Sequence, residues 1–361
     1  MQLLSLETVG FRNLADGRLE FPARGVVLTG ANGQGKTNLL EAAGYPVLFR
    51  SLRGAADAEL VRFESAGFRV AVRFASQGRE REAAASFSQL GRKKRLWVDG
   101  AESLRLLDAA GAWLTVGFQP ADVALASGPA ALRRQYLDRV LALADRPYLL
   151  ALARYRKALA QRNAALRQQR SDLAGAFDGP LAAAGARLVA TRIEWVSRQR
   201  EPFCAELVAL GELGEMGLEY SGDPALADAA AWPAALAQAA DRDRHRGMTT
   251  LGPHRDDLVL RLEGRRLRDY GSTGQQRSAA IGLRLLEWNT LAESRGAPPA
   301  LLLDDAFAEL DGERQRRLSA RLLGRTGSGG QVLLTAPRLD ELPPGLDLPV
   351  WTVQRGRVEQ A

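Results

Sequence analysis

The sequence predicts an α/β protein interrupted by a mostly helical lobe, and three observations support this fold class. A β-branched and apolar run leads through a glycine-rich loop into a helix within residues 26–48. Residues 67–98 alternate between apolar and polar positions, as strands with one buried face do. Residues 130–245 follow helical periodicity and are rich in Ala, Leu and Arg. We therefore expect a mixed sheet with flanking helices, an antiparallel β layer and an inserted helical lobe.

The composition argues against a disulfide-bonded, zinc-binding or membrane-spanning protein, and it leaves open what the positive net charge means. With 49 Lys and Arg against 42 Asp and Glu, the net charge of +7 either favours a polyanionic partner or reflects an Arg-rich composition. The single cysteine, Cys204, rules out an intramolecular disulfide, and no Cys/His cluster indicates a zinc site. No apolar run reaches the roughly 18 residues of a membrane-spanning helix, and the N-terminus does not read as a signal peptide. We expect a cytoplasmic protein with no membrane partner.

The N-terminal part of the mixed sheet is expected within residues 1–122. Its predicted elements are strands at 3–9, 18–21, 67–74, 96–98 and 113–116 and a helix at 36–48. The first two strands flank the polar turn Phe11-Arg12-Asn13, and the dipeptide Asp99-Gly100 is typical of a hairpin turn.

The glycine-rich loop fits the phosphate-loop pattern G-x-x-x-x-G-K-[ST] between a strand and a helix. Its residues are Gly30, Ala31, Asn32, Gly33, Gln34, Gly35, Lys36 and Thr37, followed by Asn38. The glycines let backbone N–H groups and the helix N-terminus surround phosphate oxygens. Lys36 should reach the β- and γ-phosphates and Thr37 should ligate Mg²⁺, whereas a chance glycine-rich turn would do neither. The sequence therefore predicts a site for ATP and Mg²⁺.

The inserted lobe is expected at residues 123–247. Apolar residues recur at helical spacing beyond Pro129, and Pro147 and Pro180 fit the first turns of two further helices. The helix that Pro180 opens should stop before Pro202, because the residue before a proline is pushed out of the helical conformation. The predicted helices are short and punctuated, with no sustained heptads, so we expect no long coiled coil.

The C-terminal part of the mixed sheet is expected at residues 248–361. The pattern predicts strands at 258–262, 300–303 and 332–334, helices after Ser272 and at 312–324, and a closing hairpin at 350–356.

The strand at 300–303 ends in two carboxylates, Asp304 and Asp305. After a phosphate loop in the same chain, this is where a carboxylate holds Mg²⁺ through its water shell, the role we expect for Asp304. Asp305 would then act as a general base or position the attacking water. A strand that merely ends in an acidic turn is the alternative.

A second anion site is predicted where Ser272, Thr273, Gly274 and Gln275 precede a helix. A Ser and a Gly at a helix N-terminus can bind a phosphate. Ser272 or Thr273 can equally cap the helix, with Gln275 near position N3. The two interpretations are compatible.

In this order the motifs resemble those of ABC-type ATPases. There Gln119 corresponds to the Q-loop residue that links Mg²⁺ to the insertion, residues 272–275 to the signature that closes over the γ-phosphate of a partner subunit, and Glu309-Leu310-Asp311 to the loop that touches that subunit. Within this group the chain resembles the RecF family, which is related to SMC proteins. The resembling motifs span almost the whole chain: Phe11-Arg12-Asn13, Gly33-Gln34-Gly35-Lys36-Thr37-Asn38 with Leu40-Glu41, Arg133-Arg134 with Leu137-Asp138, Gly252-Pro253-His254-Arg255-Asp256-Asp257, Gly274-Gln275-Gln276-Arg277 and Leu303-Asp304-Asp305 with Glu309-Leu310-Asp311.

The resemblance implies an ATP-dependent protein of recombinational repair. RecF-like proteins bind ATP, form homodimers in its presence and bind DNA at gaps or single-strand/double-strand junctions. They work with RecR and RecO to help RecA displace single-strand-binding protein, in gap repair, replication restart and the SOS response. This implies a cytoplasmic, nucleoid-associated protein.

The resemblance also assigns roles to residues. The expected catalytic residues are Lys36, Gln119 and Asp305; the expected Mg²⁺ ligands are Thr37, Gln119 and Asp304; the expected ATP contacts are Arg12, residues 30–38, Ser272, Gly274 and Gln275. Arg12 would stack on adenine or contact phosphate, unless it is a solvated turn residue.

Three departures from the family pattern bear on turnover. Thr273 stands where many members have Gln, Thr335 where ABC ATPases have a switch histidine, and Asp305 where they have a catalytic Glu. The last two predict a weak ATPase.

Two other functions remain open at this stage. The ATPase subunit of an ABC transporter shares the nucleotide motifs but usually keeps the switch histidine and the catalytic Glu. An ATP-dependent nuclease would need metal ligands, for which His254-Arg255-Asp256 is a poor cluster. The basic run at 92–95 either contacts DNA phosphates or protects an exposed hairpin edge.

Overall fold

The computed structural model describes residues 1–307, 310–327, 330–342 and 345–360, and the chain divides into two compact units. Unit 1 combines Met1–Asp122 with Glu287–Ala361, and unit 2 is Val123–Leu286. Each unit has its own sheets, helices and core.

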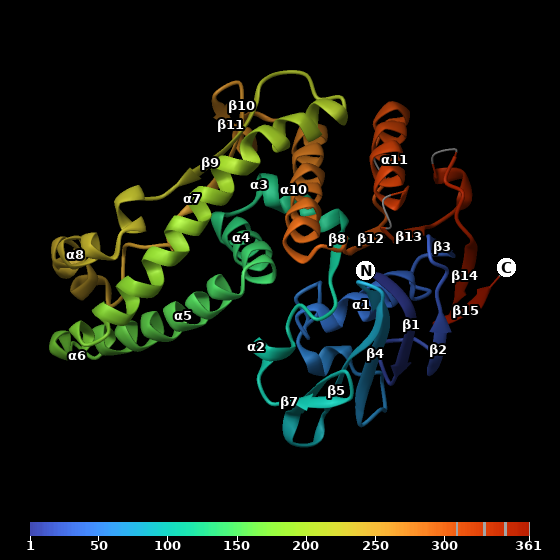
Figure 1. Ribbon diagram of the computed structural model, residues 1–361, viewed down its shortest axis with the longest axis horizontal. Helices are drawn as coiled ribbons and strands as arrows, with labels where there is room; N and C mark the ends of the chain where they lie inside the picture. Colours follow the sequence, from blue (N-terminus) through green and yellow to red (C-terminus); the bar gives the residue numbers. More distant parts are fainter. Residues whose placement is uncertain (308–309, 328–329, 343–344, 361) are drawn as a thin grey trace. The chain divides into compact units, whose positions relative to one another are not determined.

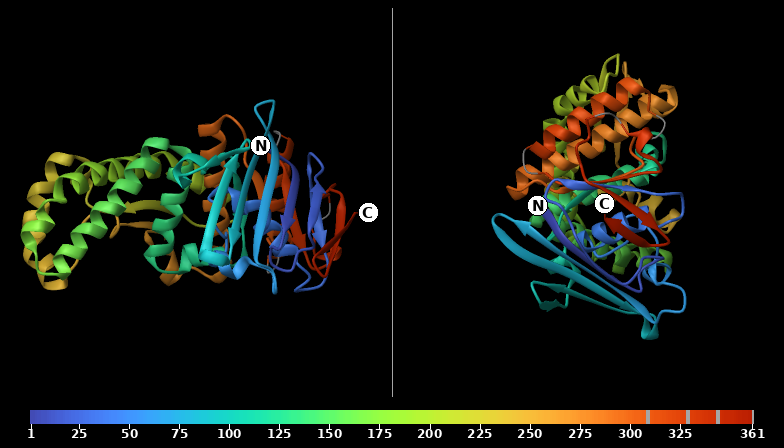
Figure 2. Two further views of the ribbon diagram at one scale, coloured as in Figure 1. Left: turned by 90° about the horizontal axis from the view of Figure 1, so that it is seen from below. Right: turned by 90° about the vertical axis from the view of Figure 1, so that its right-hand side faces the viewer.

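Unit 1 is built on two six-stranded sheets, visible in Figures 1 and 2. The antiparallel sheet has the order β2-β1-β4-β5-β6-β7 and consists of β1 (Gln2–Val9), β2 (Gly17–Glu20), β4 (Gly67–Ser76), β5 (Arg79–Ser88), β6 (Lys93–Val98) and β7 (Ala101–Ser103). The mostly parallel sheet has the order β15-β14-β3-β13-β12-β8 and consists of β3 (Gly25–Thr29), β8 (Thr115–Phe118), β12 (Ala300–Asp304), β13 (Val332–Ala336), β14 (Val350–Gln354) and β15 (Arg357–Gln360). Its helices are α1 (Lys36–Gly44), α2 (Leu106–Ala109), α11 (Gly312–Gly327) and the short 3-10 helices η1 (Tyr45–Val47), η2 (Asp57–Leu60), η3 (Leu90–Arg92) and η7 (Leu339–Glu341), with η4 (Pro120–Val123) at the unit boundary.

The two sheets of unit 1 enclose helix α1. This helix packs against β1 of the antiparallel sheet and against β12 and β13 of the parallel sheet. The predicted apolar stripe of β4 faces the core, because Phe68, Val70, Val72 and Phe74 are all buried. The predicted mixed sheet, flanking helices and antiparallel layer are therefore confirmed.

Unit 2 is mostly helical and carries one small sheet of order β11-β10-β9. Its elements are α3 (Ala124–Ser127), α4 (Ala130–Ala144), α5 (Arg146–Arg167), α6 (Ser171–Gly175), α7 (Asp178–Ala209), β9 (Met216–Ser221), η5 (Pro224–Ala227), η6 (Ala229–Ala231), α8 (Trp232–Arg246), β10 (Asp257–Leu262), β11 (Arg265–Arg266), α9 (Leu267–Tyr270) and the first part of α10 (Thr273–Arg295). Helices α5 and α7 lie side by side, joined through α6 (Figure 1).

Helix α7 corrects the prediction of short helices and of a stop before Pro202. It continues through Pro202 for a total length of 32 residues. A proline inside a helix removes one backbone hydrogen bond and costs about 3 kcal/mol. Apolar side chains on both sides of it, including Trp195, Phe203 and Leu207, are buried in the unit's core, and their burial offsets this cost. Tertiary packing therefore overrides the local signal.

Two features of unit 2 differ from the prediction: strand β9 was not predicted, and the inserted lobe ends later in the chain. Strand β9 pairs antiparallel with β10, for example Leu218 with Leu260. The predicted lobe ended at residue 247, whereas the compact unit extends to Leu286. Strand β10 packs against α4, and in α10 Gly282 lies against Phe203 of α7 while the Leu283 carbonyl accepts from the Tyr136 hydroxyl of α4. Within the described residues, no helix is both long enough and apolar enough to cross a membrane.

Candidate nucleotide-binding site

The site lies at the carboxyl ends of four parallel strands of unit 1. Strands β3, β13, β12 and β8 are neighbours in this order. Their register places Thr335 opposite Asp304 and Phe118 opposite Leu303, so Gln119 begins the loop next to the Asp304 loop. Ligands bind in α/β sheets at this edge, where the loops converge. The parallel sheet therefore brings the phosphate loop, Asp304, Asp305 and Gln119 to one edge, whereas Arg12 follows β1 of the antiparallel sheet.

The phosphate loop presents an open helix N-terminus. Gly30, Gly33 and Gly35 have φ values of 140°, 79° and 115°, which residues with a Cβ rarely adopt. Gly35 is the N-cap of α1, and among the described residues no side chain caps this helix. Its first N–H groups therefore have no intrahelical partner and are available to an anion. Lys36 is buried and donates from Nζ to the carbonyl oxygens of Gly30 and Ala31.

Two turns hold the phosphate loop in place. Asn13 donates from Nδ2 to the Gly33 carbonyl at 3.3 Å and accepts at Oδ1 from Asn38 Nδ2 at 2.8 Å. On the other side, the Gly356 N–H donates to the Gln34 carbonyl at 2.8 Å. A Cβ on Gly356 would lie 1.8 Å from the Asn13 carbonyl oxygen, so only glycine permits this approach. The exposed tip between the two turns consists of Ala31, Asn32 and Gly33.

Asn13 and Gly356 are site residues that the sequence reasoning missed. Phe11-Arg12-Asn13 was predicted as a polar turn and noted as a family motif, without a contact between Asn13 and the phosphate loop, and the closing hairpin gave no signal that it touches the loop.

Two of the three predicted Mg²⁺ ligands, Thr37 and Asp304, are in direct contact. Thr37 donates from Oγ1 to Asp304 Oδ1 at 2.8 Å, and Thr335 donates from Oγ1 to the same oxygen at 2.9 Å. The Asp305 N–H in turn donates to Thr335 Oγ1 at 3.0 Å. Hydroxyl and carboxylate oxygens at a phosphate loop are the ligands that Mg²⁺ uses, with the remaining positions held by water and phosphate. The donor set therefore fits Mg²⁺. Thr335 Oγ1 also lies 3.3 Å from Asp305 Oδ1, so this hydroxyl contacts both carboxylates.

Asp305 has the properties of a proton acceptor. Its backbone is left-handed, with φ 47°, which turns the residue sharply away from the strand direction of β12. Burial, and then the negative charge of Asp304, raise the pKa of the Asp305 carboxyl, while Lys36 opposes the increase. A carboxyl with a raised pKa accepts a proton more readily, which is what a general base requires. The predicted catalytic role stays a prediction.

Gln119 is half-buried at the start of η4. Its backbone N–H donates to Asp122 Oδ2 at 2.9 Å, which fixes the turn after β8. Its side-chain amide has no hydrogen-bond partner in the part of the chain that is described. This amide is free to reach a metal ion or a water. The Q-loop role of Gln119 stays a prediction.

Arg12 is anchored rather than freely solvated. Its Nε donates to Glu41 Oε2 at 3.0 Å and its Nη1 donates to the Glu59 carbonyl at 3.2 Å. The Glu41 side chain is fully buried on α1 and also accepts from the Ser51 hydroxyl. Arg12 thus has a fixed position next to the helix that follows the phosphate loop. Contact with adenine or phosphate stays a prediction.

The signature residues belong to unit 2 and form a capping box at the start of α10. Ser272 Oγ accepts from the Gln275 N–H at 3.3 Å, and Gln275 Oε1 accepts from the Ser272 N–H at 2.9 Å. Ser272 is exposed and Gly274 partly exposed. The capping role is therefore present, and the contact with a second subunit's phosphate stays a prediction.

The structure describes Asp311 and His254 of the remaining motifs, but not Glu309. Asp311 accepts hydrogen bonds from the backbone N–H groups of Glu313 and Arg314 at the start of α11, whereas Glu309 lies outside the described residues. His254 is bonded to the Tyr155 hydroxyl at 2.6 Å and the Thr249 carbonyl at 3.0 Å, so it has a structural role. The described residues contain no group of three or more His, Cys, Asp and Glu side chains arranged for a metal.

The basic run at 92–95 is not uniformly free to contact DNA. Lys94 pairs with Asp57 at 3.0 Å, donates to the Phe49 carbonyl and lies over the Tyr45 ring at 5.0 Å. Strand β6 carries residues 93–95 of this run and pairs with β5 along its whole length, but β7 pairs only with Leu96–Val98. The basic part of β6 is therefore an open strand edge, and protection of this edge by charge stays a prediction. If this run contacts DNA, the contacts are expected from Arg92, Lys93 and Arg95.

Comparisons with known proteins point to one family. No protein-family model matches the chain. It is 39% identical over 374 residues to the DNA replication and repair protein RecF of Anaeromyxobacter dehalogenans, covering 99% of both chains. It is 36% identical over 348 residues to that of Myxococcus xanthus, covering 93% of this chain and 90% of the relative.

Solved structures agree. The recombination mediator protein RecF with ATP, of the RecFOR pathway, matches with a TM-score of 0.89 and 28% identity over 100% of this chain and 97% of that one. RecF with ATPrS matches with a TM-score of 0.88 and 29% identity over 99% and 97%. An SMC head bound to the winged-helix domain of ScpA matches with a TM-score of 0.59 and 16% identity over 100% and 97%, which shows a shared fold alone. The ABC transporter interpretation is therefore not supported.

Proposed function

Because this chain belongs to the RecF family of DNA replication and repair proteins, we propose that it is an ATP-dependent DNA-binding protein of recombinational repair. The observation that carries the proposal is the hydrogen bond between Thr37 of the phosphate loop and Asp304 at the end of β12. It joins the two halves of a Mg²⁺–nucleotide site that are far apart in the sequence. The similar structures that contain ATP or ATPrS support ATP as the nucleotide.

Each residue has a defined task in this site. The loop N–H groups and Lys36 would bind phosphate oxygens, and Thr37, Asp304 and the Gln119 amide would hold Mg²⁺. When bound, Mg²⁺ neutralises charge on the phosphates as a Lewis acid. Asp305 holds the water and accepts its proton.

The dimer and its partners follow from the family. We propose that ATP brings two copies together, with Ser272, Gly274 and Gln275 of each facing the γ-phosphate bound by the other. The dimer binds gapped or junction DNA in the cytoplasm at the nucleoid. With RecR and RecO it helps RecA load onto DNA coated with single-strand-binding protein. The RecFOR pathway named for the similar structures supports these partners.

The dimer is expected to bind DNA more tightly and with a steeper salt dependence than the monomer. Two basic chains brought together contact more phosphates, and each phosphate neutralised adds about 0.9 to the slope of log affinity against log salt. The measurement is fluorescence anisotropy of a labelled gapped duplex across a salt series, with and without ATP. Equal slopes in both conditions would show that ATP does not gate DNA binding.

Ser272→Arg provides the control for this experiment. The bulky cation should prevent packing against a partner's phosphate while leaving the unit 1 site and its ATP affinity intact. Light scattering should show the wild type doubling in mass with ATP and the variant remaining a monomer with the shallow slope. If the variant also doubles in mass, Ser272 is only the cap of α10.

Asp305→Asn is expected to slow ATP hydrolysis about a hundredfold, the lower range for loss of a general base. Wild-type turnover itself should fall below about 10 s⁻¹, because Asp305 is shorter than Glu and Thr335 cannot replace an imidazole.

The rate of ATP hydrolysis by the wild type should depend on the protonation of Asp305. Because the pKa of Asp305 is raised, the rate should begin to fall on acidification at a higher pH than an ordinary aspartate would give. A pH–rate profile tests this: the variant should lack that decline, and an unaltered rate would exclude the role.

A further inference from the structure

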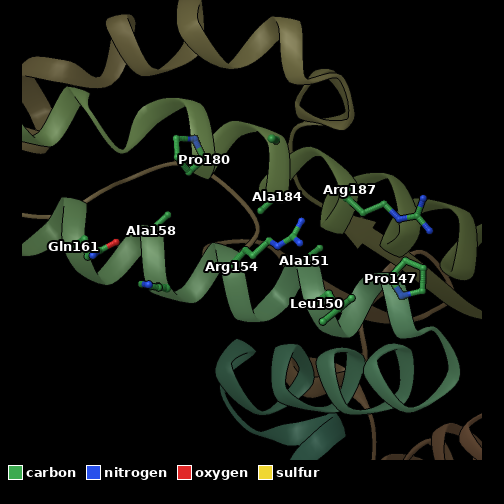
Figure 3. A pocket seen from close by; sticks show the side chains of 11 residues that line it. Pro147, Leu150, Ala151, Arg154, Ala158, Gln161, Pro180, Ala184 and Arg187 are labelled. Atoms are coloured by element: carbon green, nitrogen blue, oxygen red, sulfur yellow. The ribbon is translucent and has the colours of Figure 1, made fainter. Parts of the chain in front are cut away.

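Unit 2 contains an open groove between α5 and α7 that the nucleotide site does not use. Its volume is about 690 Å³ (Figure 3). From Pro147 on α5 and from Pro180 on α7, lining residues follow the spacing i, i+3, i+4 and i+7. This spacing marks one face of each helix. Both helices therefore present a second face here, in addition to the face that each buries in the core.

The floor of the groove is apolar and shallow. Ala151 and Ala184 form buried parts of it, and Pro147, Leu150 and Ala183 are exposed apolar positions around them. Small side chains let another helix approach closely, because interaxial distances of 8–10 Å depend on the residues at the contact. From Pro147 the α5 face extends for about 20 Å, at about 1.5 Å per residue. That length suits a helix of several turns.

The rim of the groove is cationic. Arg154, Lys157 and Arg187 line it, and no lining residue is acidic. Arg154 extends along the strip between α5 and α7 (Figure 3). In the described part of the chain neither Arg154 nor Lys157 has an ion-pair partner, whereas Arg187 pairs with Asp145 at 3.2 Å. The groove thus offers uncompensated positive charge beside apolar surface.

We propose that the α5–α7 groove binds an acidic, amphipathic α-helix of a partner protein. The apolar face of such a helix would fill the groove and its carboxylates would meet the rim cations, a recurring mode of peptide recognition. DNA fits less well, because phosphates gain nothing from an alanine and leucine floor. A second copy of the chain is not favoured, because its amphipathic helix α11 is rich in Arg. The proposal is independent of the nucleotide site.

The test uses a labelled peptide of about five helical turns, with Leu and Ala at i, i+3, i+4 and i+7 and Glu on the flanking positions. A peptide of the same composition in scrambled order, a version with Lys in place of Glu, and a labelled DNA duplex are the comparison probes. Fluorescence anisotropy with the full-length protein should show binding of the acidic amphipathic peptide at least about tenfold tighter than of either other peptide.

Two groove variants and one matched control complete the experiment. Arg154→Glu with Lys157→Glu removes the attraction, Ala183→Trp fills the groove without changing its charge, and each should weaken peptide binding about tenfold. Arg200→Glu reverses an exposed cation on α7 about 20 Å beyond Arg187, and it should change the affinity less than about twofold. Circular dichroism and ATP affinity should stay at wild-type values in all three.

The proposal fails if the scrambled peptide binds equally well or if both groove variants bind the acidic peptide like the wild type. It also fails if the charge-reversal variant loses duplex DNA binding while peptide binding is unchanged, because the groove is then a nucleic-acid contact.

Discussion

Lys36→Ala is expected to reduce ATP affinity roughly ten- to a hundredfold. The ammonium group is the one cationic contact that the phosphate loop itself supplies, and a charge-assisted hydrogen bond of this kind contributes about 1.5–3 kcal/mol. Lys36 already lies within the loop, where Nζ donates to the Ala31 carbonyl at 3.2 Å. Phosphate oxygens would therefore meet a positioned charge rather than a mobile one. Isothermal calorimetry with Mg²⁺–ATP measures the loss directly.

The control for this prediction is Lys93→Ala, which removes an exposed cation of the same unit from β6. It should leave ATP affinity unchanged. Lys36→Met should behave like Lys36→Ala, because it keeps the aliphatic stem and loses only the charge. If ATP binds both Lys36 variants with wild-type affinity, the loop is not a phosphate site.

Arg192→Met is expected to destabilise unit 2 by about 3–5 kcal/mol, the cost of breaking a buried ion pair from one side. Arg192 lies on α7, and its side chain is buried in the core of unit 2. It donates to the Tyr148 hydroxyl at 3.0 Å, the Pro253 carbonyl at 2.6 Å and Asp138 Oδ1 at 2.7 Å. The substitution leaves these three acceptors without their shared donor. Hydrogen exchange of the α7 backbone amides should accelerate about a hundredfold or more.

Arg198→Met is the matched control on the same helix. Arg198 forms an exposed pair with Glu194 at 3.6 Å, and exposed pairs contribute about 0–1 kcal/mol. Its removal should change the exchange rates of α7 by only a few fold. Wild-type protection in Arg192→Met would mean that the buried network does not stabilise this unit.

The two central apolar strands, the phosphate loop and the acidic pair could be predicted from the sequence because each is a local pattern. The glycines, the lysine and the hydroxyl of the phosphate loop all lie between Gly30 and Thr37, and the strand before Asp304 is continuously apolar. The alternation of β4 likewise specified its buried face. Such patterns need no knowledge of distant neighbours, so these elements appear in the structure where they were expected.

The positions of Asn13 and Gly356 against the phosphate loop could not be predicted, nor could the pairing of Arg12 with Glu41. Each depends on segments that meet only after folding, such as the C-terminal hairpin and the first turn of the chain. The same holds for β9, whose partner strand β10 lies beyond α8. A single sequence contains no signal for contacts at this separation.

By itself the sequence predicted a phosphate loop, an acidic pair at the end of a buried strand and a helical insertion, because each is a pattern of neighbouring residues. Only the tertiary structure decided how these parts are held. It aligned four parallel strands so that Thr37 lies 2.8 Å from Asp304, and it carried α7 through Pro202. The physical reason is that burial and hydrogen bonding between distant segments stabilise what local propensity leaves undetermined or opposes.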